Sequence, residues 1–356
     1  MSKFRAGVLY GQELMDLYAD AKKNGYAMPG VNAVGTSSVN AIMETAAAVN
    51  SPVIVQLSFG GGHFYAGKSL KNDNMQASAA GCISAAMHVH QVAEMYGVPV
   101  VLHTDHCSLE NIAWIDHLLD FQETYYEKHG KPLFSSHMLD LSEETLKENI
   151  DICKQYLERM SKLDIGLEIE LGITGGEEDG VDNSDVDSSK LYSHPTEIFY
   201  AYHRLIKVSP NFTIAAAFGN VHGVYRPGNV KLSVEILENS QRYVEEQLGM
   251  EGMKPVSFVF HGGSGSSPTD ISRSIDYGVI KMNLDTDMQW AFTSGIRDYT
   301  TEYKDYIAEQ IGNPDGDDLP NKKYYDPRKV LRMGEEYFVK RLKQSFADLH
   351  CMGRNA

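Results

Sequence analysis

Eight short apolar runs recur along the 356-residue chain, and longer polar or amphipathic stretches separate them. Runs of this kind are typical of strands buried on both faces, whereas the stretches between them have helical spacing. Eight strand and helix units in a chain of this size predict a single α/β domain over residues 1–356, a (β/α)₈ TIM barrel. The predicted strands lie near residues 30, 55, 101, 135, 168, 214, 259 and 281.

Three segments of the sequence add detail to a minimal barrel. Residues 172–190, GITGGEEDGVDNSDVDSSK, are polar and rich in Gly and Asp, which predicts a mobile loop insertion. The tail at about 313–356 has apolar spacing that predicts helices packed outside the barrel or on another subunit. After the fourth strand, SEETLKENIDICKQYLERMSK predicts a helix that opens at Ser142.

Composition excludes several classes of protein. The chain has 48 acidic and 32 basic residues, a net charge of −16, which argues against nucleic acid as a partner. No apolar run is long enough to span a membrane, and the N-terminus MSKFRAGVLYG is too polar for a signal peptide. Four widely spaced cysteines without a CxxC pair indicate reduced thiols. We therefore expect a cytoplasmic protein with no membrane partner.

Polar residues stand at the end of every predicted strand. Catalytic groups of barrel enzymes collect at the C-terminal ends of the strands, so these residues are expected to converge. A single histidine at a strand end is usually structural, but three histidines with several carboxylates on one face indicate a site. The strand-end residues are Asn32, Ser58, Asp105 with His106, Asp140, Glu168 with Glu170, His222, His261, and Asn283 with Asp285.

Three of these residues have the pattern of a zinc site. His106, His222 and His261 follow the third, sixth and seventh predicted strands, and three imidazoles with an open fourth position bind catalytic Zn²⁺. Cys107 is a weaker candidate because adjacent residues seldom bind one ion. His103 shares the face of Asp105, which suggests a supporting role.

Two further histidines, His88 and His90, resemble a metal-binding HxH pair. Their context, SAAMHVHQVAEMYG, is helical, and residues two apart on a helix point away from each other. We therefore expect them to lie on a helix surface or in the core.

A glycine- and serine-rich run, HGGSGSSPTD, follows the seventh strand at residues 261–270. Its glycines allow successive N–H groups to converge, Ser266 or Ser267 can cap a helix, and Pro268 suits the first helical turn. Barrels often bind phosphate between strands seven and eight, so this loop predicts a phosphate site.

The carboxylates divide into three groups. Glu168 and Glu170 alternate with apolar residues and should face the barrel interior. Asp105 adjoins a predicted zinc ligand and can therefore reach a substrate oxygen. Glu177 and Glu178, in GGEEDG, either bring a carboxylate onto a bound substrate or form a solvated acidic loop.

Five motifs together resemble one family. HTDHC, LEIELGITGGEEDG, AAAFGNVHGVY, FVFHGGSGS and KMNLDTDMQW are similar to segments of the long-type, class II fructose-1,6-bisphosphate aldolases, in collinear order over nearly the whole chain. The resemblance implies a zinc-dependent, homodimeric (β/α)₈ lyase of glycolysis and gluconeogenesis. It would cleave fructose 1,6-bisphosphate reversibly to dihydroxyacetone phosphate and glyceraldehyde 3-phosphate.

The resemblance also implies roles for individual residues. His106, His222 and His261 would bind the catalytic zinc, Asp105 would transfer the proton of the C4 hydroxyl, and Glu178 would be the loop acid/base. A second divalent metal would use Asp140 and Glu170.

Contacts to the substrate follow from the same comparison. Asn32 is a further expected contact, Ser58 corresponds to a contact with glyceraldehyde 3-phosphate, and Arg328 to a phosphate ligand that reaches across the dimer. A monovalent cation, K⁺ or Na⁺, would lie near the phosphate loop. The positions that would hold dihydroxyacetone phosphate are Gly223, Gly262, Gly263, Ser264, Asn283, Leu284, Asp285 and Thr286. Family members often have SNGG where this chain has SFGGGH, so Phe59 and His63 are departures near Ser58.

Four alternatives compete with this interpretation. A Schiff-base aldolase could use Lys281, but the three strand-end histidines would then have no role. A zinc hydrolase would place metal ligands on the first strands, where there is no histidine. A tagatose-1,6-bisphosphate aldolase differs only in the configuration of one hydroxyl group. A non-catalytic sugar-phosphate binding protein would keep the barrel without the chemistry.

Overall fold

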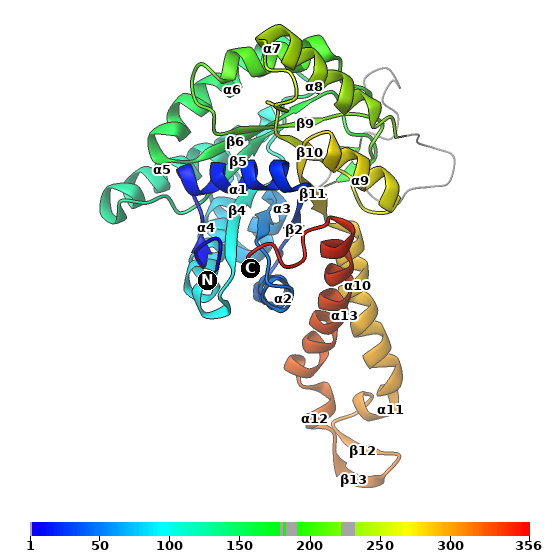
Figure 1. Ribbon diagram of the computed structural model, residues 1–356. Coiled ribbons are helices and arrows are strands. Elements are labelled where there is room, and N and C mark those ends of the chain that lie inside the picture. Colours follow the sequence, from blue (N-terminus) through cyan, green and yellow to red (C-terminus); the bar gives the residue numbers. More distant parts are fainter. Residues whose placement is uncertain (1, 179–180, 183–190, 222–231) are drawn as a thin grey trace.

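A computed structural model describes residues 2–178, 181–182, 191–221 and 232–356 (Figure 1). Its centre is a closed barrel of parallel strands, which follow one another around the ring in chain order until β11 pairs with β2. The pairing of β4 with β5 completes the ring, so the predicted barrel is confirmed. The barrel strands are β2 (Met28–Asn32), β3 (Val53–Leu57), β4 (Pro99–Thr104), β5 (Ser136–Leu139), β6 (Gly166–Leu171), β9 (Phe212–Ala216), β10 (Phe258–Phe260) and β11 (Val279–Leu284).

The strand sequences explain why both faces of the barrel wall are buried. In β6, Leu167, Ile169 and Leu171 alternate with Glu168 and Glu170, and all five side chains are buried. Side chains alternate between the two faces of a strand, so the apolar set packs under the helices while the glutamates face the interior. The barrel interior therefore contains charged side chains, and these side chains support the site at the strand ends.

Helices cover the outside of the barrel. They are α2 (Thr36–Ala48), α3 (Phe59–Ala66), α4 (Gln76–Tyr96), α5 (Ile112–His129), α6 (Leu146–Met160), α7 (Pro195–Leu205), α8 (Glu235–Leu248) and α9 (Pro268–Asp276).

The start of α6 differs from the expectation. The helix begins at Leu146, and the Thr145 hydroxyl caps it by accepting the N–H of Glu148 at 3.3 Å. Ser142 was the wrong cap because its hydroxyl donates instead to Oδ1 of Asp140, at 2.7 Å. The serine therefore supports a residue of the site.

The N-terminal segment closes one end of the barrel. Strand β1 (Gly7–Val8) pairs with the first two residues of β4, and α1 (Gly11–Asn24) follows it. Lys22 of α1 donates hydrogen bonds to the carbonyls of Lys254 and Pro255, which precede β10. Helix α1 therefore packs against the N-terminal ends of the strands, opposite to the ends that carry the predicted site.

Helices α10 (Thr286–Glu302) and α13 (Pro327–Asp348) run side by side as an arm that projects from the barrel (Figure 1). Gly334 allows the close approach, because a Cβ there would lie 2.9 Å from the Phe292 ring. Helix α13 also packs on α2, so the predicted helical extension outside the barrel is confirmed. The outer end of the arm carries α11 (Lys304–Ile307), the hairpin of β12 (Ile311–Asn313) and β13 (Gly316–Pro320), and α12 (Lys322–Tyr325).

The cysteines are reduced, as expected from their spacing. All four are buried and unpaired, and burial raises the pKa of Cys82 to about 12. No helix among the described residues is both long and apolar enough to cross a membrane.

In the predicted loop insertion, β7 (Glu177–Glu178) pairs with β8 (Val181–Asp182), while residues 179–180 and 183–190 lie outside the described residues. Its predicted mobility therefore stays a prediction.

Candidate metal and active site

Metal-binding side chains gather at the C-terminal ends of the barrel strands. One possible ligand atom each from Asp105, His106 and His261 lies within 4.8 Å of the other two. His106, Asp140 and Glu170 form a second group of the same kind. The structure thus brings together these five residues, and His106 belongs to both groups. The sixth residue expected near a metal is His222.

The backbone after β4 directs His106 into this site. The Asp105 N–H still bonds to the Leu57 carbonyl of β3 at 3.0 Å, which extends the ladder by one residue. His106 then adopts φ +32°, a value that non-glycine residues seldom take and that costs energy. The turn places Nδ1 of His106 3.0 Å from Asp140 Oδ2 and 3.5 Å from Glu170 Oε2.

His261 is enclosed by carboxylates at the end of β10. Its Nε2 lies 2.9 Å from Glu168 Oε1 and its Nδ1 lies 3.2 Å from Glu170 Oε2. Burial lowers the pKa of the His261 imidazole, but the charge of Glu170 and hydrogen bonds to both glutamates outweigh burial and raise it to about 9. The His106 and His261 ring centroids are 4.6 Å apart. The surroundings therefore favour positive charge between these rings.

Asp140 contributes a second source of negative charge. Burial opposes ionisation of this carboxyl, but hydrogen bonds from His106 and Ser142 outweigh it and lower the pKa. A carboxylate of this kind remains charged across the physiological range. Together with Glu170 and His106, it supplies the mixed oxygen and nitrogen ligands that suit a divalent ion. The residues present therefore fit a metal.

Asp105 is held by two side-chain amides from neighbouring strands. Gln56 of β3 donates to Oδ2 at 2.9 Å, and Asn283 of β11 donates to Oδ1 at 3.0 Å. Gln56 also donates to Asn32 of β2, so the expected contacts Asn32 and Asn283 both belong to the hydrogen-bond network around this carboxylate. Gln56 was missed in the sequence, although a single glutamine in the apolar strand VIVQL was a usable signal.

A buried ion pair lies deeper in the barrel. Lys281 of β11 donates to both oxygens of Glu168 at 2.8 Å, and both side chains are buried. Burial opposes ionisation of Glu168, but Lys281, His103 and His261 together outweigh burial and hold its pKa well below the usual value. The Lys281 amine is thus committed to a carboxylate, which argues against its use as a Schiff-base nucleophile.

His103 belongs to the same interior network. Its Nδ1 lies 2.8 Å from Ser136 Oγ, and its Nε2 lies 3.7 Å from Glu168 Oε2. Burial and the nearby Lys281 charge lower the pKa of His103 well below its usual value, so the ring is neutral. His88 and His90, by contrast, lie on α4, where they pair with Asn40 and the Leu133 carbonyl.

The glycine-rich loop lies beside the end of β11. Gly262 and Gly265 have φ values of +60° and +83°, which favour glycine. A Cβ on Gly263 would clash with Met282, so the loop packs directly on the next strand. Ser267 caps α9 by accepting the Asp270 N–H at 3.1 Å, as one of the two expected serines. Since β10 and β11 pair, this loop and residues 283–286 occupy neighbouring strand ends.

Three of the expected contacts occupy other settings. Ser58 is buried at the end of β3, where its hydroxyl accepts the Gly61 N–H at 3.1 Å. Arg328 stands in the first turn of α13, at the outer end of the arm, with its side chain 89% exposed and paired to Asp326 (Figure 1). Glu178 lies in β7.

His222 and Gly223 lie outside the described residues. The departures from the family pattern have local explanations. Phe59 packs against Trp114 with ring centroids 5.8 Å apart, and His63 is bonded to the Leu70 carbonyl.

The closed parallel barrel, with ionisable side chains from several strands at its C-terminal end, defines the class of (β/α)₈ barrel enzymes. The family model for class II fructose-bisphosphate aldolases matches residues 12–354. A fructose-bisphosphate aldolase of Campylobacter jejuni is 56% identical over 351 residues, which are 99% of this chain and 98% of that protein.

Two further comparisons agree. A class 2 fructose-bisphosphate aldolase of Escherichia coli K12 is 55% identical over 98% of this chain and 97% of that protein. The crystal structure of the fructose-bisphosphate aldolase from Campylobacter jejuni superposes with a TM-score of 0.90 at 54% identity, covering 99% and 98% of the two chains.

The chain belongs to the class II fructose-bisphosphate aldolase family. It is therefore an aldehyde-lyase that acts on sugar phosphates and uses a divalent metal. The resemblance drawn from the sequence motifs is confirmed, and the matches favour it over the tagatose and non-catalytic alternatives.

The donor atoms of His106 and His261, and the position of His222 after the sixth predicted strand, predict the effect of removing each histidine. His106→Ala, His222→Ala and His261→Ala should each bind the metal at least 10- to 100-fold more weakly, a loss seen even when only supporting groups are removed. Metal content after dialysis, measured by mass spectrometry, tests this expectation. His88→Ala is the matched control, because that residue lies on α4. Full metal content in any of the first three variants would remove that residue from the ligand set.

Proposed function

We propose that this aldolase cleaves fructose 1,6-bisphosphate at a zinc ion held by His106, His222 and His261. The observation that carries the proposal is the close grouping of ligand atoms from Asp105, His106 and His261 at the barrel mouth. Imidazole ligands with one open position are typical of catalytic zinc. The names of the Campylobacter and Escherichia relatives support fructose bisphosphate as the substrate.

When bound, the metal ion acts as a Lewis acid that stabilises the negative charge developing on the ketone half as the C3–C4 bond breaks. Asp105 removes the proton of the C4 hydroxyl in cleavage and returns it in condensation. The amides of Gln56 and Asn283 fix the orientation of this carboxylate. A positioned acid/base typically contributes roughly 10²–10⁴-fold to the rate.

Asp140 and Glu170 are proposed to hold a second divalent ion beside His106. Their ligand atoms lie within 4.8 Å of one another, and both carboxylates are positioned by other side chains. Ser142 donates to Asp140, and Thr174 donates to Glu170 at 2.6 Å. Such supporting hydrogen bonds orient metal ligands.

Dihydroxyacetone phosphate is proposed to bind at Gly223, Gly262 to Ser264 and Asn283 to Thr286, with Asn32 beside it. Gly262 and Gly265 have left-handed conformations, and α10 begins at Thr286. Glycine-rich loops and helix N-termini of this kind are common anion-binding elements. A monovalent cation, K⁺ or Na⁺, would share the phosphate loop. Ser58 would contact the glyceraldehyde 3-phosphate half.

A homodimer is proposed on the basis of the apolar surface at the base of the arm. A groove of about 550 Å³ lies there between α2, α3, α10 and α13, and most of its exposed surface is apolar. Phe64 is 58% exposed and nearby Trp290 is 65% exposed. Clustered aromatic surface of this kind is typical of protein interfaces. A cytoplasmic location is proposed as well, because all four cysteines are unpaired.

A chelator experiment tests the metal-dependent reaction. Cleavage of fructose 1,6-bisphosphate should be lost after EDTA treatment and return with Zn²⁺ or Co²⁺, and the tagatose epimer should be a poorer substrate. Borohydride with substrate should not inactivate the enzyme, because Lys281 is held by Glu168. Coupled assays measure all three effects. Irreversible labelling of Lys281 by borohydride would overturn the metal mechanism.

The two proposed acid/base residues should have separable functions. Glu178→Ala should abolish exchange of the C3 proton of dihydroxyacetone phosphate and slow cleavage. Asp105→Ala should slow cleavage by about 10²-fold or more while retaining exchange, because the C4 oxygen belongs to the aldehyde half. Deuterium exchange followed by NMR distinguishes these outcomes. Glu177→Gln is the matched control, and normal exchange in Glu178→Ala would make Glu177 or Asp179 the next candidate.

Arg328 is proposed to bind a phosphate in the active site of the partner subunit. Mixing Arg328→Ala with His106→Ala should restore up to about a quarter of wild-type activity, because random pairing gives half heterodimers with one intact site each. Arg332→Ala is the control on the same helix, since Arg332 pairs with Glu44 of its own chain at 2.7 Å. Heterodimers verified by mass spectrometry but lacking activity would place Arg328 in its own site or in a structural role.

A further inference from the structure

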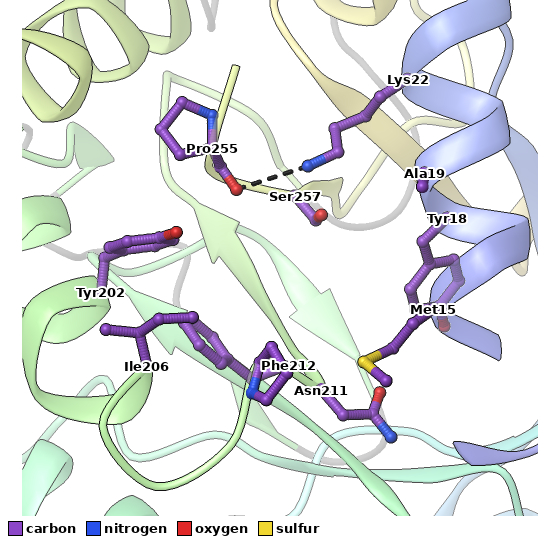
Figure 2. Close-up of a pocket in the computed structure, with 11 residues that line it drawn as sticks. Met15, Tyr18, Ala19, Lys22, Tyr202, Ile206, Asn211, Phe212, Pro255 and Ser257 are labelled. Atoms are coloured by element: carbon purple, nitrogen blue, oxygen red, sulfur yellow. Dashed lines mark hydrogen bonds between the residues drawn. The ribbon is translucent and has the colours of Figure 1, made fainter. Parts of the chain in front are cut away.

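A second pocket has a volume of about 220 Å³, and Figure 2 shows the residues that line it. It lies at the opposite end of the barrel from the metal site, because residues at the starts of strands line it. Its walls come from α1, from α7, and from residues at the starts of β9 and β10, including Asn211 and Phe212. This pocket lies at the N-terminal ends of the strands, so the aldolase reaction does not use it. Pockets for drug-sized ligands measure about 300–1,000 Å³, which limits any ligand here to a small molecule.

Lys22 is the only basic side chain among the lining residues, and it extends from α1 towards the pocket (Figure 2). Its amine donates to the carbonyls of Lys254 at 3.1 Å and Pro255 at 3.3 Å. A charged amine has three N–H groups, so one of them can still donate to a ligand. Within the described parts of the chain Lys22 has no carboxylate partner. Burial lowers the pKa of this amine to about 8. An anion in the pocket would compensate the partly buried charge.

Three other polar side chains line the pocket without a side-chain hydrogen bond to any described residue. They are Asn211, which is 7% exposed, Tyr202, which is 9% exposed, and the partly buried Ser257. Water still reaches the polar atoms of Asn211 and Tyr202 at the pocket. A ligand that carries hydrogen-bonding atoms can therefore replace this water without leaving either group unpaired.

The rest of the lining is apolar. Met15 of α1 and Ile206 after α7 face each other across the pocket, and Phe212 forms its base with its ring 5.7 Å from that of Tyr202 (Figure 2). Flat aromatic and aliphatic walls favour a compact ring. Sugar phosphates have no such apolar body, so the expected ligand is chemically different from the aldolase substrates.

We propose that this pocket binds a small aromatic monocarboxylate. The carboxylate accepts hydrogen bonds from Lys22 and Ser257, and the ring packs between Met15, Ile206 and Phe212. Asn211 and Tyr202 are then available to a ring substituent such as a hydroxyl group. The ligand makes no contact with the metal-binding side chains, which lie at the other end of the strands.

Binding of benzoate to the metal-loaded enzyme tests the proposal, with calorimetry and ligand-observed NMR as readouts. Benzoate should bind saturably, and Lys22→Met should weaken binding by at least about tenfold because a charge-assisted hydrogen bond is lost. Lys23→Met, at an exposed neighbour on α1, should leave the affinity unchanged. Benzamide, which has the ring without the charge, should bind at least about tenfold more weakly to the unaltered protein, for the same reason.

Two further measurements separate this site from the active site. The benzoate affinity should be the same with EDTA and with saturating fructose 1,6-bisphosphate, since carboxylates can also bind metals. Loss of binding with either addition would assign benzoate to the metal site and overturn the proposal. Equal affinity for benzoate and benzamide, equal binding in Lys22→Met, or no saturable binding would overturn it as well. None of these outcomes depends on whether the enzyme cleaves its proposed substrate.

Discussion

The ion pair between Lys281 and Glu168 is the interaction on which the barrel interior depends. Both side chains are buried where the strands enclose them, and Glu168 also contacts His261. Removing one member of such a pair typically costs about 3–5 kcal/mol, because the remaining charge has neither water nor a partner. A polar barrel interior is therefore stable only while these charges compensate each other. The same compensation holds Glu168 in place as a fixed support for His261.

Negative charge is still in excess around the two histidines. Glu170 lies 3.5 Å from Nδ1 of His106 and 3.2 Å from Nδ1 of His261, and Asp140 lies 3.0 Å from the same nitrogen of His106. Protonation of the imidazole rings is one way to compensate these carboxylates. A divalent ion replaces those protons with a stronger positive charge, so metal binding and stability of the site are linked. A site that binds a divalent ion therefore needs carboxylates and imidazoles together at these strand ends.

Much of this arrangement could be predicted from the sequence, because strands buried on both faces leave continuous apolar runs and their C-terminal ends share one side of the barrel. That reasoning identified Asp105, His106 and His261 as neighbours. It missed Gln56, since its contact with Asp105 depends on strand register, which an apolar run does not specify. It also misplaced the start of α6, because Ser142 and Thr145 are both acceptable caps locally. Only the position of Asp140 decides between them.

The N-terminal helix α1 lies close to the buried charges of the barrel interior. Tyr18 of α1 lines the second pocket, and its hydroxyl has a hydrogen bond with Ser136. Burial and the nearby charge of Glu168 raise the pKa of Tyr18, so the phenol remains neutral beneath the ion pair. By closing the N-terminal end, α1 keeps water away from Glu168 and Lys281, and charges attract more strongly where water is excluded. A helix at the opposite end of the barrel from the metal-binding side chains therefore contributes to the charge balance that positions them.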